Sequence, residues 1–314
     1  MVASGSPIPP PMAQGLVERR VRSVLGAARA RRTGVAVETL WELLPESEGF
    51  GESEAEEWIQ SRPETATVVD GTAYAADSPP TPPEADRRAR GKDFIDRAHS
   101  LLQNELAPVH PLLSSLGVTG STAYGEPEEG DDVDFLAVVR PGAVWPFLAY
   151  CYLAVRLRPG RAGDPSAWCF NYVVDETAAL EIFRRPQGFL FAREALSSRP
   201  IRGEPFYRGL LRASPWLREE APRLYARWEV GGLPEPAAPS PAPAPVRLLN
   251  RLAFPLIAAY LHLAGLYRNH RLWREGRGAE SFRVETRLDR LILRTEEYER
   301  LKALYAPASR IAGP

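Results

Sequence analysis

Residues 116–140 read LGVTGSTAYGEPEEGDDVDFLAVVR, and this stretch decides the fold that we expect. A short apolar run ends at Gly120 and Ser121, a polar glycine-rich segment follows, and a second apolar run surrounds Asp132 and Asp134. The second run is rich in β-branched and aromatic residues, which predicts a β-strand. Side chains two positions apart share one face of a strand, so the two aspartates are expected to point the same way.

The two aspartates create an electrostatic conflict that a bound cation would relieve. Carboxylates placed side by side repel each other, and the pKa of one is raised unless a cation lies between them. A hard divalent ion such as Mg²⁺, held by carboxylates and by substrate phosphates, meets this requirement. Gly120 lets the backbone approach a ligand closely, and Ser121 with the amides after it can bind phosphate oxygens if a helix begins there.

The order of these features resembles the signature of the polymerase-beta-type nucleotidyltransferase superfamily, and the resemblance covers residues 112–174. It implies that Gly120 and Ser121 hold the phosphates of a nucleoside triphosphate (NTP), expected to be ATP. It also implies that Asp132 and Asp134 bind Mg²⁺ or Mn²⁺. The reaction implied is transfer of a nucleoside monophosphate to an acceptor hydroxyl, which the sequence does not identify.

The same resemblance implies a fold and raises the question of a third carboxylate. The superfamily builds a small mixed sheet flanked by helices, so we expect an α+β protein. Many active members carry a third carboxylate on the next strand, which here is residues 168–174 (WCFNYVV) and offers Asn171. Asp175 and Glu181 are the two candidate substitutes. Alternation along the strand predicts that Tyr172 lies on the face opposite Asn171.

An amide at this position keeps a second function open. The amide of Asn171 coordinates a cation weakly and cannot act as a base near neutral pH. The chain is therefore either an active nucleotidyltransferase or a catalytically degenerate module of the same fold. Such a module would sense a nucleotide or neutralise a partner as an antitoxin does. A DNA-binding regulator is the third and least favoured function.

The composition is that of an ordinary soluble protein and points to no particular partner. The chain has 314 residues, of which 44% are hydrophobic and 25% are charged, which suits two or three modules. A net charge of −1 indicates neither nucleic acid nor a membrane, although nucleic acid stays open as a partner. Cys151 and Cys169 are isolated, which fits a reducing cytosol and neither a disulfide framework nor a zinc site. We therefore expect a cytoplasmic protein without a membrane partner, in which the most apolar window, residues 248–267, is a buried helix.

Changes of composition divide the chain into five segments. They are a disordered tail at 1–15, a winged-helix-like domain at 16–77, the nucleotidyltransferase domain at 86–230, a proline-rich linker at 231–245 and a C-terminal helical segment at 246–310. The first domain is expected to hold three helices, then a hairpin that turns at Asp70-Gly71. Its third helix is expected to begin with a capping box of Ser53 and Glu56. That helix is acidic, which opposes DNA phosphates and favours a packing or protein-interaction role.

Two helices are expected after the linker. Residues 248–273 are largely apolar and then basic, and residues 282–305 carry apolar side chains at helical spacing. Arg268 belongs to the basic group, for which contact with phosphates, contact with an acidic partner and exposure at a helix end are all open. Residues 200–204 (PIRGE) are expected to form a turn.

Overall fold

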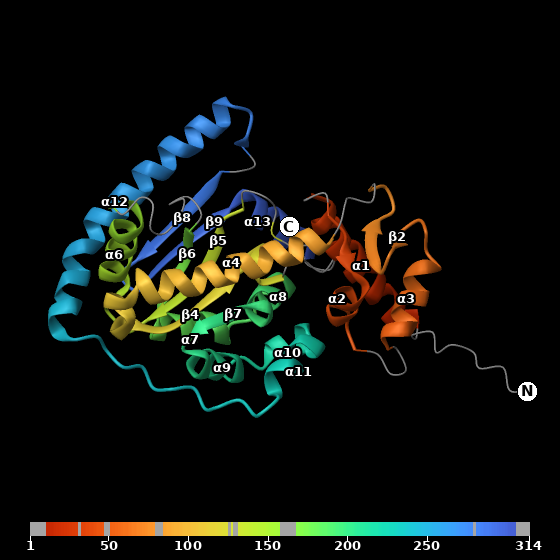
Figure 1. The fold of residues 1–314 in the computed structure, drawn as a ribbon, viewed down its shortest axis with the longest axis horizontal. Coiled ribbons are helices and arrows are strands. Elements are labelled where there is room, and N and C mark those ends of the chain that lie inside the picture. Colours follow the sequence, from red (N-terminus) through yellow and green to blue (C-terminus); the bar gives the residue numbers. More distant parts are fainter. Residues whose placement is uncertain are drawn as a thin grey trace, which may run out of the picture.

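The computed structural model of this chain describes residues 11–30, 33–46, 51–78, 84–124, 127, 131–157, 168–278 and 281–305. Figure 1 shows a small N-terminal module beside a larger unit in which helices cover a central sheet. The protein is therefore of mixed α+β class, as the sequence predicts.

The N-terminal module contains three helices and a three-stranded antiparallel sheet. Its elements are α1 (Pro11–Ala30), β1 (Val35–Ala36), α2 (Val37–Glu42), α3 (Glu52–Gln60), β2 (Ala66–Val69) and β3 (Thr72–Ala75), with strand order β1-β3-β2. The predicted hairpin turn is confirmed, because Asp70 and Gly71 join β2 to β3 with φ values of 49° and 73°. The strand β1 was not predicted, because two residues give no alternation to detect.

Two details of this module differ from the prediction. The expected tail is helical over residues 11–15, and residues 1–10 lie outside the described part of the chain. The helix α3 begins after Gly51, whose N–H donates to the Glu54 carboxylate at 3.0 Å. The predicted cap at Ser53 is therefore wrong, because the first turn forms earlier in the chain around the extended Gly51 backbone.

Six strands form one mixed sheet at the centre of the larger unit. They are β4 (Leu113–Thr119), β5 (Val133–Val139), β6 (Trp168–Asp175), β7 (Arg199–Arg202), β8 (Phe282–Arg287) and β9 (Arg290–Thr295), in the order β7-β4-β5-β6-β9-β8. Neighbours are antiparallel except β5 and β6, which run parallel. A parallel pair needs a crossover connection, and the connection here includes the apolar helix α6 (Val144–Leu157).

Helices cover both faces of this sheet (Figure 1). Phe135 faces a core shared with α4 (Glu84–Asn104), α6 and part of α12 (Ala244–Arg274). Its neighbour Leu136 faces the opposite core, shared with α7 (Glu176–Arg184), α8 (Phe189–Ser197), α9 (Glu204–Arg212), α10 (Trp216–Glu220) and α11 (Pro222–Glu229). The second core continues into the N-terminal module, where the Arg20 guanidinium lies 3.3 Å from the ring centroid of Phe189. The two modules are therefore joined by packing.

The predicted helix over residues 282–305 is wrong. Residues 282–295 form the hairpin of β8 and β9, and α13 (Glu296–Tyr305) alone is helical. Ile292 on β9 pairs with Tyr172 on β6. The apolar pattern of these residues fits the period of a helix and that of a strand. The strand forms because β9 pairs with the edge of β6 and satisfies the backbone hydrogen bonds of that edge. The C-terminal segment thus completes the central sheet and is not a separate helical unit.

Other segments also differ from expectation or extend it. Residues 199–202 pair with β4 as an edge strand, so the predicted turn is wrong there. The helix α7 was not predicted. The proline-rich segment 231–243 has no helix or strand, as expected of a linker. It is nevertheless fastened to the larger unit, because Ala242 N–H donates to Pro141 O at 3.0 Å.

A bulge in β6 changes which of its side chains share a face. Asp134 pairs with Cys169 but Leu136 pairs with Tyr172, so β6 contains one more residue than β5 between these two pairs. The predicted alternation is therefore wrong beyond the bulge, and Tyr172 packs against the same core as Leu136. Bulges of this kind redirect side chains, and Asn171 lies within it.

The helix α12 is present as predicted, but its expected burial is wrong. Figure 1 shows it along the outer edge of the larger unit, on the side away from the N-terminal module. Among the described residues it is the one helix long and apolar enough to cross a membrane, judged by length and composition, and 17% of its most apolar window is buried. Most of its apolar side chains therefore face outward.

Candidate functional site

The three central strands bring the predicted acids together at one end of the sheet. β4 ends where Thr119 pairs with Asp134 on β5, and Asp134 pairs in turn with Cys169 on β6. Asp132 lies just before β5, and one ligand atom from each of Asp132, Asp134 and Cys169 falls within 4.8 Å of the others. The two aspartates thus converge as the strand period predicts, with a thiol beside them that sequence reasoning did not place there.

Gly120 stands directly against Asp134. Its φ of +66° lies in the left-handed region, and a Cβ built on it would lie 2.6 Å from Asp134 Oδ2. A side chain here would therefore strain the backbone and displace the carboxylate. The short helix α5 (Gly120–Tyr124) begins at this residue, and the Ser121 hydroxyl donates to Asp131 Oδ2 at 2.9 Å. The structure thus places Gly120 and Ser121 beside the acidic pair.

Asn171 joins the cluster at the position where a third carboxylate was sought. Its Nδ2 donates a short hydrogen bond to Asp134 Oδ1, and its Oδ1 accepts one from the Cys169 thiol, with 2.6 Å between Sγ and Oδ1. These two contacts fix the amide between a thiol and a carboxylate. The third strand therefore contributes a neutral side chain to the site.

The charge states in the cluster favour a hard cation. Burial raises the pKa of Asp132, and the charge of Asp131 adds to the rise. Burial, followed by the charges of Asp134 and Asp132, raises the pKa of the Cys169 thiol well above its usual value, so this thiol keeps its proton at neutral pH. Two of the three possible ligands, Asp132 and Asp134, are carboxylates, which Mg²⁺ prefers. The residues present thus fit Mg²⁺ or Mn²⁺.

The helix α12 brings a positive charge towards these acids. Arg268 opposes the burial effect by lowering the pKa of both Asp132 and Cys169. Its guanidinium lies 5.1 Å from the ring centroid of Phe282, on the neighbouring strand β8. A guanidinium here can also pair with a phosphate group. Of the three roles considered for Arg268, this position favours contact with phosphates.

Glu194 is a neighbour of the site that sequence reasoning missed. It lies on α8, and its Oε2 accepts a hydrogen bond from Gly120 N–H at 3.3 Å. A further carboxylate thus stands next to the glycine that touches Asp134, on a helix and not on the third strand. No local signal marks Glu194, because α8 meets the end of β4 only when its apolar side chains pack on the assembled sheet.

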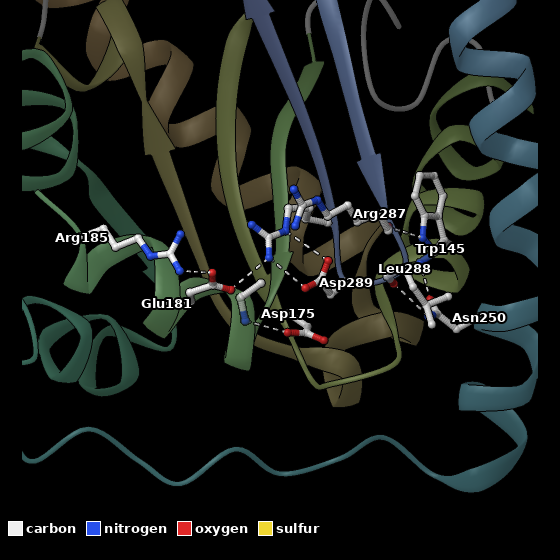
Figure 2. A network of polar contacts seen from close by, with 10 residues as sticks. Trp145, Asp175, Glu181, Arg185, Asn250, Arg287, Leu288 and Asp289 are labelled. Atoms are coloured by element: carbon white, nitrogen blue, oxygen red, sulfur yellow. Dashed lines mark hydrogen bonds and ion pairs between the residues drawn. The ribbon is translucent and has the colours of Figure 1, made fainter. Parts of the chain in front are cut away.

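The structure places Asp175 and Glu181 away from the cluster. Asp175 pairs with Val139, at the opposite end of β5 and β6 from Asp134. Its carboxylate caps α7 by accepting a hydrogen bond from Ala178 N–H at 2.9 Å. Figure 2 shows Glu181 beside Arg185 and near Asp289, in an ion-pair network that it joins at 2.8 Å from the Arg185 guanidinium. Neither residue supplies the third carboxylate, and both stabilise the fold.

Comparison with known proteins adds nothing to this geometry. No protein-family model, no curated protein and no solved structure matches the chain. The candidate site therefore rests on the positions and the chemistry of its own residues.

Proposed function

We propose that this chain is a cytoplasmic, Mg²⁺-dependent nucleotidyltransferase that transfers a nucleoside monophosphate from an NTP, expected to be ATP, to an acceptor hydroxyl. The observation that carries the proposal is the close approach of Gly120 to Asp134, where a Cβ would lie 2.6 Å from the carboxylate. A glycine lets the chain turn come this close to the paired acids, so a triphosphate bound by the turn would lie beside a metal ion held by Asp132 and Asp134.

Each residue of the cluster has a role in this proposal. Asp132 and Asp134 would hold the metal ion, whose positive charge would neutralise the phosphates of the NTP. The backbone at Gly120 and Ser121 positions the triphosphate, and Arg268 supplies further positive charge. Positioning and charge neutralisation account for most of the catalysis in phosphoryl transfer. The chemistry thus needs few reactive side chains.

The architecture supports the proposal. The sheet is small and mixed, with helices on both faces. Gly120 and Ser121 directly follow β4, and Asp132 and Asp134 lie at the start of its neighbour β5. The order of helices and strands in the N-terminal module, with strand order β1-β3-β2, supports a winged-helix-like module. Its third helix exposes Glu52 and Glu57, which favours protein contact over DNA contact.

A second candidate is a catalytically degenerate domain that binds nucleotide as a sensor or regulator. Asn171 favours it, because a neutral amide donates to Asp134 at the place of a third carboxylate. Such a domain would bind an NTP with Mg²⁺ but release no pyrophosphate. Measurement of binding and of pyrophosphate release on the same preparation separates the two functions.

Isothermal titration of each NTP, with Mg²⁺ and with EDTA, tests the nucleotide site. We expect Mg²⁺-dependent binding that weakens at least about 100-fold in Asp134→Ala, since even residues that only orient metal ligands change affinity by about 10- to 100-fold. Asp175→Ala is the matched control. It should keep the affinity while losing about 1 kcal/mol of stability with its helix cap. Absence of NTP binding under every condition would overturn both candidate functions.

Restoring the third carboxylate should strengthen metal binding. In Asn171→Asp a carboxylate replaces the amide that donates to Asp134. We expect at least about tenfold tighter binding of Mn²⁺, because ligand charge governs affinity for hard cations. Metal-free stability should fall, because two carboxylates then face each other. Asn171→Ala, which removes the hydrogen bond without adding charge, is the control, and equal Mn²⁺ affinity in the two variants would place Asn171 outside the metal site.

A further inference from the structure

The outward side of α12 is an exposed apolar surface in the described structure. Large hydrophobic side chains along it are 52–74% exposed, and we call them the outer face: Leu248, Leu249, Leu252, Leu256, Tyr260, Leu263, Leu266, Tyr267 and Trp273. Apolar residues of this size usually lie inside a protein, and a contiguous exposed set indicates an interaction surface. Their spacing along one helix makes the outer face continuous over most of its length.

The opposite side of α12 is fastened to the rest of the molecule. Asn250 is buried, accepts a hydrogen bond from Trp145 N–H at 2.8 Å and donates one to Leu288 O at 3.1 Å (Figure 2). Further along, the Asn269 amide bonds both backbone groups of Phe282, at 2.8 and 3.1 Å. Crossing a bilayer would break these contacts. The helix is therefore built to lie on a surface and not to span a membrane.

The charges on α12 indicate which kind of partner surface the outer face would bind. The helix contains no aspartate or glutamate, and four of its arginines stand near the two ends of the outer face: Arg247, Arg251, Arg271 and Arg274. A second copy of this helix would bring arginines towards arginines in a parallel or an antiparallel pairing. The acid that follows the helix, Glu275, is already paired with Arg271 and Arg277. Anionic lipid headgroups are complementary to both the apolar face and the flanking positive charge.

We propose that α12 docks this protein on the surface of an anionic phospholipid bilayer. The leucines of the outer face enter the boundary between headgroups and acyl chains, as in other interfacial amphipathic helices. Tyr260, Tyr267 and Trp273 lie at the level of the headgroups, which suits aromatic side chains with a polar atom. The arginines pair with lipid phosphates. This departs from the absence of a membrane partner that composition alone suggests.

Co-sedimentation of the full-length protein with vesicles tests the proposal. We expect binding to phosphatidylglycerol vesicles that is at least about tenfold tighter than binding to phosphatidylcholine vesicles, and that weakens as salt is added. Leu256→Asp with Leu263→Asp should abolish it. These side chains are 74% and 67% exposed, so the fold should survive. Val230→Asp, at a residue 76% exposed outside α12, is the matched control and should bind as wild type does.

A second variant tests the charge separately from the apolar face. Arg251→Gln with Arg274→Gln should weaken binding to phosphatidylglycerol by roughly 25-fold, at about fivefold for each arginine near an anionic surface. Failure of the wild type to bind phosphatidylglycerol, or binding unaffected by the leucine substitutions, would overturn the proposal. So would a wild-type dimer by light scattering that Leu256→Asp with Leu263→Asp converts to a monomer, since a second copy would then cover the outer face.

Discussion

The Asp132→Asn variant is expected to be more stable than the wild type without metal and less stable with Mg²⁺ and nucleotide. Without metal, the substitution removes a carboxylate whose charge is disfavoured by burial and by the neighbouring Asp131. With nucleotide at 100 times its dissociation constant, binding adds about 2.7 kcal/mol to the wild type. The variant lacks one metal ligand and should gain almost none. Thermal unfolding with and without the ligand measures both differences.

Without metal, the difference in stability between Asp132→Asn and the wild type should depend on pH. The raised pKa of Asp132 sets the sign of this dependence. The folded protein binds this proton more tightly than the unfolded chain, whose aspartates have a pKa of about 3.9. Stability of the wild type therefore falls as pH rises from that value through the folded pKa. The advantage of Asp132→Asn is fully present above the folded pKa. It should disappear below the unfolded value, where both side chains are neutral.

A surface aspartate provides the control for this experiment. The side chain of Asp93 on α4 is 65% exposed, so Asp93→Asn should change neither the metal-free stability nor the gain from nucleotide. Full nucleotide stabilisation in Asp132→Asn would show that Asp132 does not hold the metal ion. Higher stability of the wild type without metal would contradict the electrostatic account of the acidic pair.

The Gly203→Ala variant is expected to lose about 2–5 kcal/mol of stability, the sum of left-handed backbone strain and overpacking. Gly203 has a φ of +67° between β7 and α9, and a Cβ built on it would lie 1.9 Å from Ser114 O. The obstacle is backbone of the adjoining strand, so it cannot rotate away. Urea unfolding measures the loss.

A second glycine separates the two causes of this loss. Gly231 also has a positive φ, +80°, but a Cβ there would meet nothing within 4 Å. Gly231→Ala should therefore cost about 1 kcal/mol, the backbone strain alone. Equal losses in the two variants would mean that contact with the Ser114 backbone contributes nothing and that β7 can move away from β4.

The sequence by itself determined the features that depend on a few adjacent residues. The turn at Asp70-Gly71 follows from backbone angles that these residue types adopt readily. The common direction of Asp132 and Asp134 follows from the period of a strand. Gly120 and Ser121 lie beside them because the two apolar runs pair as neighbouring strands. The centre of the candidate site is therefore local in origin.

The tertiary structure alone decided whatever depends on pairing between distant segments. The pattern of residues 282–295 suits a helix or a strand, and the open edge of β6 selects the strand. The bulge in β6 turns Tyr172 to the other face of the sheet. The packing of α8 places Glu194 beside Gly120, although no local pattern in the sequence marks Glu194. The apolar window in α12 predicts a helix but not its exposure. Burial depends on which neighbours a face meets, and here none of the described elements covers it.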